Sequence, residues 1–123
     1  MPETRTWFPG ARLNYAENLL RFNGDNIAIT SARETGHVAQ YSFRQLREMV
    51  RELAAALRVN GLQCGDRVAA VITNSIDSVV IALAATSIGA IFSSTATDMG
   101  IQVNDDIFTW ISVRSNGLVG CPR

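Results

Sequence analysis

In the first half of the chain, the spacing of apolar and polar residues changes from a pattern typical of strands to one typical of a helix. Two short β-prone runs come first, at residues 27–30 and 38–43, and the polar segment Glu34-Thr35-Gly36-His37 separates them. Such runs, joined by a short turn that contains glycine, are typical of a β-hairpin. From Ser42 onward the apolar residues repeat in steps of three and four. The pattern therefore predicts an antiparallel hairpin that is followed directly by a helix.

The predicted helix starts at Ser42 and is the most clearly patterned element of the chain. Ser42 and Gln45 have the S-x-x-Q spacing of a capping box. Apolar residues at 46, 49, 50, 53, 54 and 57 form one stripe, and charged residues fill the other face. Burial of each large side chain in the stripe contributes on the order of 1.5–3 kcal/mol, so burial places the helix against a core. We interpret the charged face as solvated rather than as a docking surface. Asn60-Gly61 predicts the end of the helix.

The middle of the chain predicts a strand, a helix and a second strand. A strand is predicted at residues 67–73, where residues 68–72 are apolar without alternation, which is typical of a parallel strand covered on both faces. Asn74 or Ser75 can cap a helix that runs to about Ile88 and leaves little polar surface. A short strand at residues 90–94 follows it. The fold class is therefore α/β: a β-hairpin, a helix, and then a right-handed βαβ unit with parallel strands.

The composition argues against several classes of function, among them nucleic-acid binding and membrane insertion. The chain has 123 residues and is 47% hydrophobic, which suits one domain with a modest core. Eleven acidic residues balance eleven basic residues, and all of the basic residues are arginine. A net charge of zero therefore argues against binding to nucleic acid or to an anionic membrane surface. The most apolar stretch, 79–92, is too short to span a bilayer, and the first residues lack the layout of a secretory signal. We therefore expect a cytoplasmic protein.

The sequence offers few groups for catalysis. It contains no glycine-rich phosphate loop and no nucleophile elbow. The hydroxyl-rich run at 93–97 has neither a glycine nor a lysine, so we interpret it as a polar strand end. His37 falls in the predicted turn, where a solvated role is expected. Cys64 and Cys121 have no partners at metal-ligand spacing, so both are expected to be free thiols. No catalytic residue and no metal site are predicted.

Three segments carry a resemblance to a known family. Residues 7–20, WFPGARLNYAENLL, resemble the opening of acetoacetyl-CoA synthetases, members of the adenylate-forming acyl-CoA synthetase superfamily of AMP-dependent synthetases and ligases. Tyr41-Ser42-Phe43 and the GDRVA run at 65–69 look like motifs found across that superfamily. Residues 89–100, GAIFSSTATDMG, are similar to the GAIWSSTSPDFG run of the acetoacetate branch. The resemblance extends from residue 7 to about residue 102.

The resemblance implies a two-step ligase chemistry. The family uses ATP and magnesium to convert a carboxylate into an acyl-adenylate, and then transfers the acyl group to coenzyme A. Its phosphate loop, ribose-binding aspartate and adenylation lysine follow the matched region, and this chain contains no lysine at all. The resemblance therefore implies a fragment that is inactive alone and binds no cofactor of its own. ATP, magnesium, coenzyme A and small-molecule substrates belong to the full-length family. In the family, the loop after the last matched strand approaches coenzyme A, so Thr97, Asp98 and Gly100 are the candidate binding residues.

The resemblance also divides the chain into three parts. Residues 1–24 are expected to be a strapping segment of the acyl-CoA synthetase type. Residues 25–102 are expected to form an incomplete AMP-dependent synthetase/ligase domain, the N-terminal part of the family's large domain. The similarity stops after Gln102, and residues 103–123 are expected to be an unrelated, aberrant tail of a truncated gene product.

Two further functions are considered beside the inactive fragment. A non-catalytic interaction or regulatory module could pair with the full-length enzyme, because half of an α/β domain leaves sheet edges and apolar faces uncovered. A compact nucleotide-binding βαβ protein is the other possibility, and the missing glycine loop argues against it. Exposed apolar surface also predicts marginal stability and association of the isolated chain.

Overall fold

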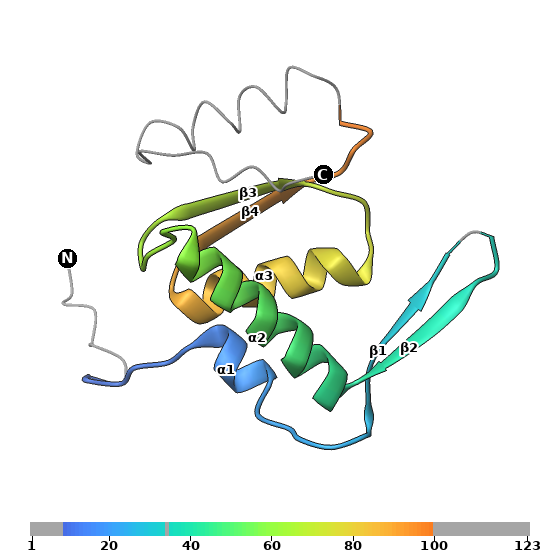
Figure 1. The fold of residues 1–123 in the computed structure, drawn as a ribbon, viewed down its shortest axis with the longest axis horizontal. Helices are drawn as coiled ribbons and strands as arrows, with labels where there is room; N and C mark the ends of the chain where they lie inside the picture. The colour runs from blue at the N-terminus through green and yellow to red at the C-terminus, as the bar shows by residue number, and fades with distance from the viewer. Residues whose placement is uncertain (1–8, 34, 100–123) are drawn as a thin grey trace, which may run out of the picture.

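The computed structural model describes residues 9–33 and 35–99 and shows an α/β arrangement, as predicted. In Figure 1 the two parallel strands lie along one side of α3, helix α2 crosses α3, and the hairpin extends away from the helices. The elements in chain order are α1 (Tyr15–Leu19), β1 (Ile27–Ala32), β2 (Val38–Ser42), α2 (Phe43–Val59), β3 (Arg67–Val71), α3 (Ile76–Ile88) and β4 (Ile91–Thr95).

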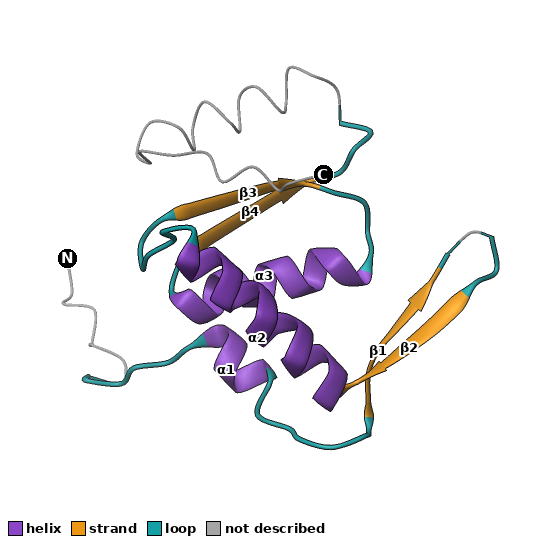
Figure 2. Cartoon of the chain, viewed as in Figure 1, coloured by secondary structure: helices purple, strands orange, loops and turns teal. Residues whose placement is uncertain are grey.

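The predicted hairpin is confirmed. Strands β1 and β2 pair antiparallel, with Ala32 opposite Val38 near the turn and a register irregularity near the start of β1. The turn is closed by two backbone hydrogen bonds, from the Arg33 amide to the His37 carbonyl and from the Gly36 amide to the Arg33 carbonyl, both 2.9 Å long. Gly36 has φ +81°, a left-handed conformation that a glycine adopts without a steric penalty. Figure 2 shows that the base of the hairpin meets the first turn of α2.

The capping box at the start of α2 is also confirmed. The Gln45 amide donates to Ser42 Oγ at 3.3 Å, and the Ser42 amide donates to Gln45 Oε1 at 2.9 Å. The first two amides of α2, those of residues 43 and 44, donate to the backbone carbonyls of Asn26 and Gly24 respectively. The first turn of α2 therefore has partners for the amide groups that a helix N-terminus leaves unpaired. Gly61, with φ +90°, follows the last turn, as its position predicts.

The core lies where α2 packs on α3. The apolar stripe of α2 faces α3, and α1 adds one completely buried alanine to the same cluster. A smaller cluster, Leu62, Ala85 and Ala90, lies between α3 and the sheet. The buried residues of the main cluster are Ala16, Leu46, Val50, Ala54, Ile76, Val80, Leu83 and Ala84.

The βαβ unit has the predicted parallel strands, but β3 is less buried than its sequence predicts. Strand β3 pairs in parallel with β4, with Val68 opposite Phe92. Helix α3 between them starts after Ser75, whose side chain makes no capping bond, and ends at Gly89 with φ +87°. The expectation that β3 is covered on both faces is wrong for the described residues, because its side chains are half-buried and Val71 is 40% exposed. In the described part of the chain β3 and β4 form a sheet of two strands, so each is an edge strand that is open along one side.

Candidate functional site

The turn after β4 carries the residues that the sequence singled out for binding. Thr97 and Asp98 are neighbours in this turn, and both are exposed. The Met99 amide donates to the Ala96 carbonyl at 3.3 Å and closes the turn. Gly100, the third candidate, lies outside the described residues. The structure therefore presents two polar side chains to solvent directly after the carboxyl end of a parallel strand.

The loop after β3 reaches the same edge of the sheet. The Ile72 amide donates to the Thr95 carbonyl at 3.1 Å, which joins the ends of the two strands. Open α/β sheets bind ligands beyond the carboxyl ends of their strands, so this edge is the natural place for a site. The segments 72–75 and 96–99 supply hydroxyl, amide and carboxylate groups but no arginine or lysine. This edge therefore cannot by itself neutralise a polyphosphate.

The structure also places the histidine and one of the two cysteines. His37 is exposed in the hairpin turn, and Cys64 is an exposed free thiol. Cys121 lies outside the described residues. Within residues 9–33 and 35–99 no cluster of histidine, cysteine, aspartate and glutamate could hold a metal ion. None of the helices in that part of the chain has the length and apolar character needed to cross a membrane.

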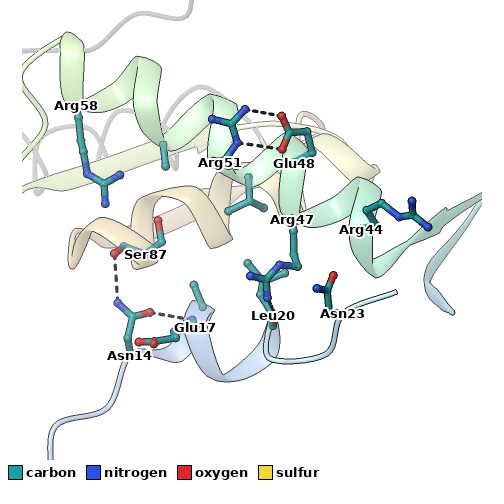
Figure 3. A pocket seen from close by; sticks show the side chains of 13 residues that line it. Asn14, Glu17, Leu20, Asn23, Arg44, Arg47, Glu48, Arg51, Arg58 and Ser87 are labelled. Carbon is teal, nitrogen blue, oxygen red and sulfur yellow. Dashed lines mark hydrogen bonds and ion pairs between the residues drawn. The ribbon is translucent and has the colours of Figure 1, made fainter. Parts of the chain in front are cut away.

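A groove of about 500 Å³ lies between α1, α2 and the carboxyl end of α3 (Figure 3). Its most prominent groups are arginines that α2 presents along one face. Two glutamates, Glu17 of α1 and Glu48 of α2, also line it, so the arginines outnumber the carboxylates. The groove therefore carries an excess of positive charge. The four arginines are Arg44, Arg47, Arg51 and Arg58.

Three of these arginines bond to other groups of the protein. Arg47 Nη1 donates to the carbonyl of Leu20, just after α1, and Arg44 pairs with Asp25. Arg51 Nε donates to Glu48 Oε2 at 3.0 Å. The side-chain hydrogen bond from Arg51 lowers the pKa of Glu48, and the same bond raises the pKa of Arg51. The bonds of Arg47 and Arg44 join α2 to the segment between α1 and β1, so we interpret the groove as a structural contact rather than as an active site.

Asn14 links α1 to the carboxyl end of α3 at one side of this groove (Figure 3). Its Oδ1 accepts from the Glu17 amide at 3.0 Å and caps α1. Its Nδ2 donates to the carbonyls of Thr86 and Ser87, each at 3.3 Å. Sequence reasoning missed the groove and this link because the partners lie more than 70 positions apart. The asparagine before an apolar pattern was the only signal that could have indicated a helix cap here.

Comparison with known proteins assigns the chain to a class. The family model described as AMP-binding enzyme matches residues 16–102, and the chain belongs to this family. Within it, the acetoacetyl-CoA synthetase of Gallus gallus is 48% identical over 107 residues, which cover 85% of this chain and 16% of the chicken protein. The acetoacetyl-coenzyme A synthetase of Rhizobium meliloti is 43% identical over 78% of this chain and 15% of its own length.

A solved structure gives the same result. The acetoacetyl-CoA synthetase from Streptomyces lividans matches with a TM-score of 0.82 and 39% sequence identity. The match covers 86% of this chain and 17% of that protein. The chain is therefore homologous to the N-terminal region of acetoacetyl-CoA synthetases, and it spans about a sixth of the length of these relatives.

Proposed function

We propose that the chain forms the N-terminal part of the AMP-binding domain of an acetoacetate-activating acyl-CoA synthetase and does not catalyse the reaction alone. The observation that carries the proposal is the similarity to the Streptomyces lividans enzyme, with a TM-score of 0.82 at 39% identity over 86% of this chain. The full-length enzyme would join acetoacetate to coenzyme A at the expense of ATP. We also propose that it acts in the cytoplasm.

The chemistry of the described residues supports inactivity of the isolated chain. Acyl-adenylate formation requires cationic groups that stabilise the negative charge of a polyphosphate. A bound magnesium ion and a basic side chain would supply that positive charge. The edge at the carboxyl ends of β3 and β4 offers hydroxyls and the Asp98 carboxylate, which repels phosphate. No lysine is present anywhere in the sequence. The described residues at this edge therefore suit a neutral ligand group better than magnesium-bound ATP, which supports the proposal.

The turn after β4 is the part of the chain to which we assign ligand contact. In the assembled enzyme Thr97, Asp98 and Gly100 would face the uncharged arm of coenzyme A, because Asp98 disfavours its phosphates. The exposure of Thr97 and Asp98 at the carboxyl edge of the parallel strands supports this assignment.

A chimera tests the proposed function. The segment of the Streptomyces lividans enzyme that matches this chain would be replaced by residues 9–102 of the chain, and acetoacetate-dependent release of pyrophosphate would be measured. We expect the chimera to keep activity within about tenfold of the parent, a cost of roughly 1.4 kcal/mol in the transition state. We expect no release above background from the isolated 123-residue chain. A folded but inactive chimera, or an active isolated chain, would show that the proposal is wrong.

A further inference from the structure

Helix α3 is predominantly apolar, with Asp77 as its only charged residue, and the described elements cover it only in part. A helix of this character belongs in the interior of a larger protein. Helices α1 and α2 and strand β4 pack on α3, but Val79 remains half-buried. A second groove, of about 350 Å³, lies at this place between the end of α1, the start of β1, α2 and α3. We call it the α3 groove, and its apolar lining includes Leu19, Phe22, Ile29, Phe43, Val79 and Leu83.

The α3 groove is apolar and presents aromatic surface. Phe22 is 53% exposed, and its ring centroid lies 5.5 Å from that of Phe43. Leu19 is 45% exposed. Arg21 is the only charged residue in the lining; its guanidinium lies 4.8 Å from the centre of the Phe22 ring and also bonds to Asn18. An occupant of this groove must therefore present apolar side chains and no buried charge.

We propose that the α3 groove is the docking site for the remainder of the AMP-binding domain, and that this chain pairs with that remainder when the two are separate polypeptides. This inference rests on the proposed function. The relatives extend far beyond the matched region, because the chain covers only 16% of the chicken protein and 17% of the Streptomyces protein. Most of the apolar surface that could cover α3 in such an enzyme therefore lies outside the matched segment.

Two other occupants fit the groove less well. A second copy of the chain in a twofold dimer centred on the groove would place the hollow against itself, and such a contact buries little surface. A small-molecule ligand would need polar groups placed inside the groove to fix its orientation. The lining supplies such groups only from Asn18 and Arg21, which bond to each other. Apolar side chains from the rest of an AMP-binding domain meet neither difficulty.

The test is reconstitution from two polypeptides. The full 123-residue chain would be co-expressed with the Streptomyces lividans enzyme from which the matched segment has been deleted. We expect the two to copurify in equal amounts and acetoacetate-dependent pyrophosphate release to rise at least about tenfold above that of the deleted enzyme alone. If the deleted enzyme remains insoluble or unpaired in the presence of the chain, the inference is wrong.

Two matched leucine variants test the groove itself. Leu19→Arg places a charge in the α3 groove, whereas Leu13→Arg makes the same change at a residue that is 93% exposed and does not line it. We expect Leu19→Arg to weaken pairing at least about tenfold and Leu13→Arg to leave it unchanged. Circular dichroism would check that each variant folds, and Phe22→Glu would replace Leu19→Arg if that variant does not. Equal pairing by the groove variant and by Leu13→Arg would overturn the inference.

The outcomes also separate this inference from the proposed function. An active chimera together with failed pairing would refute the α3 groove as a docking site and leave the proposed function standing. Pairing that depends on Leu19, together with an inactive chimera, would support the α3 groove as a docking site and refute the proposed function. A homodimer that Leu19→Arg disrupts, observed by light scattering, would assign the groove to a second copy and refute the inference.

Discussion

Replacement of Asn14 offers the sharpest test of how α1 is attached to the rest of the protein. The Asn14 side chain does two things, because its oxygen caps α1 and its nitrogen donates to two carbonyls at the end of α3. Asn14→Ala removes both functions. Asn14→Ser keeps the cap but cannot donate as far as α3, and Asn14→Asp keeps the cap while placing a carboxylate against the Thr86 and Ser87 carbonyls.

The expected destabilisation of α1 is the sum of the contributions of the individual bonds that Asn14 makes. Loss of a helix N-cap costs about 1 kcal/mol. Each of the two bonds from Asn14 Nδ2, 3.3 Å long, contributes at the low end of the usual range for a hydrogen bond, about 0.5 kcal/mol, so the two together contribute about 1 kcal/mol. We therefore expect Asn14→Ala to destabilise the docked α1 by about 2 kcal/mol and Asn14→Ser by about 1 kcal/mol. We expect Asn14→Asp to lose more than Asn14→Ser, because the carboxyl end of α3 carries partial negative charge.

Hydrogen exchange of the α1 amides reports this attachment directly. The Asn18 amide donates to the Asn14 carbonyl at 3.1 Å, and the Leu20 amide donates to the Ala16 carbonyl at 2.9 Å. Both bonds break when α1 opens, so their exchange rates follow the local opening equilibrium. A loss of about 2 kcal/mol should raise exchange of these two amides roughly 30-fold. Amides in the middle of α2 serve as the internal control.

Two results would refute this reasoning. If Asn14→Ser exchanged as slowly as the wild type, the bonds to α3 would contribute nothing. If Asn14→Asp protected α1 as well as asparagine does, the two α3 carbonyls would not be the groups that the side chain contacts.

Three further predictions concern α2 and the end of α3. Ser42→Ala removes half of the capping box and should lower the free energy of unfolding by about 1 kcal/mol in urea titrations, with Ser42→Thr as the conservative control. Gly89→Ala should cost about 1–2 kcal/mol, since Gly89 has φ +87°, and thermal unfolding would measure it. A β-carbon at residue 89 would also lie 2.8 Å from Cys64 Sγ, so Cys64→Ala should recover only the steric part of the loss. Glu48 should titrate below its ordinary pKa of 4.5 in NMR, and Arg51→Gln should raise that pKa again. Because the folded pKa is the lower one, this pair stabilises the protein above pH 4.5 and loses its effect as the pH falls through the folded value; an unchanged Glu48 pKa in Arg51→Gln would contradict the assignment.

The elements that could be predicted from the sequence are those whose causes are local. The capping box joins residues three positions apart, and the stripe that follows it repeats within a single helix, so α2 was predictable at both ends. The hairpin depends on a turn of a few residues, with Gly36 at its left-handed position. The parallel pairing of β3 and β4 followed from the helix between them.

The features that could not be predicted depend on distant partners. Helix α1 has five residues, too few to be stable alone, and the bonds from Asn14 to residues 86 and 87 hold it in place. Both grooves form between elements far apart in the chain, so no local pattern indicates them. The apolar run of β3 predicted cover on both faces, but burial depends on neighbours that a single strand does not specify. For Thr97 and Asp98 the structure gives a place, and their role in binding remains a prediction.

Ser42 is the last residue of β2 and at the same time the N-cap of α2, so no linker separates the strand from the helix. One inserted residue at this junction would rotate the helix by about 100° relative to the hairpin. The face of α2 that bears Leu46 and Val50 would then turn away from α3, while the arginines would turn toward the core. Insertions and deletions should therefore be far less tolerated at residues 42 and 43 than in the hairpin turn at residues 35–37, although both places lie near the surface. A library of single-residue insertions, scored for soluble protein, would reveal this difference as a sharp minimum at the junction.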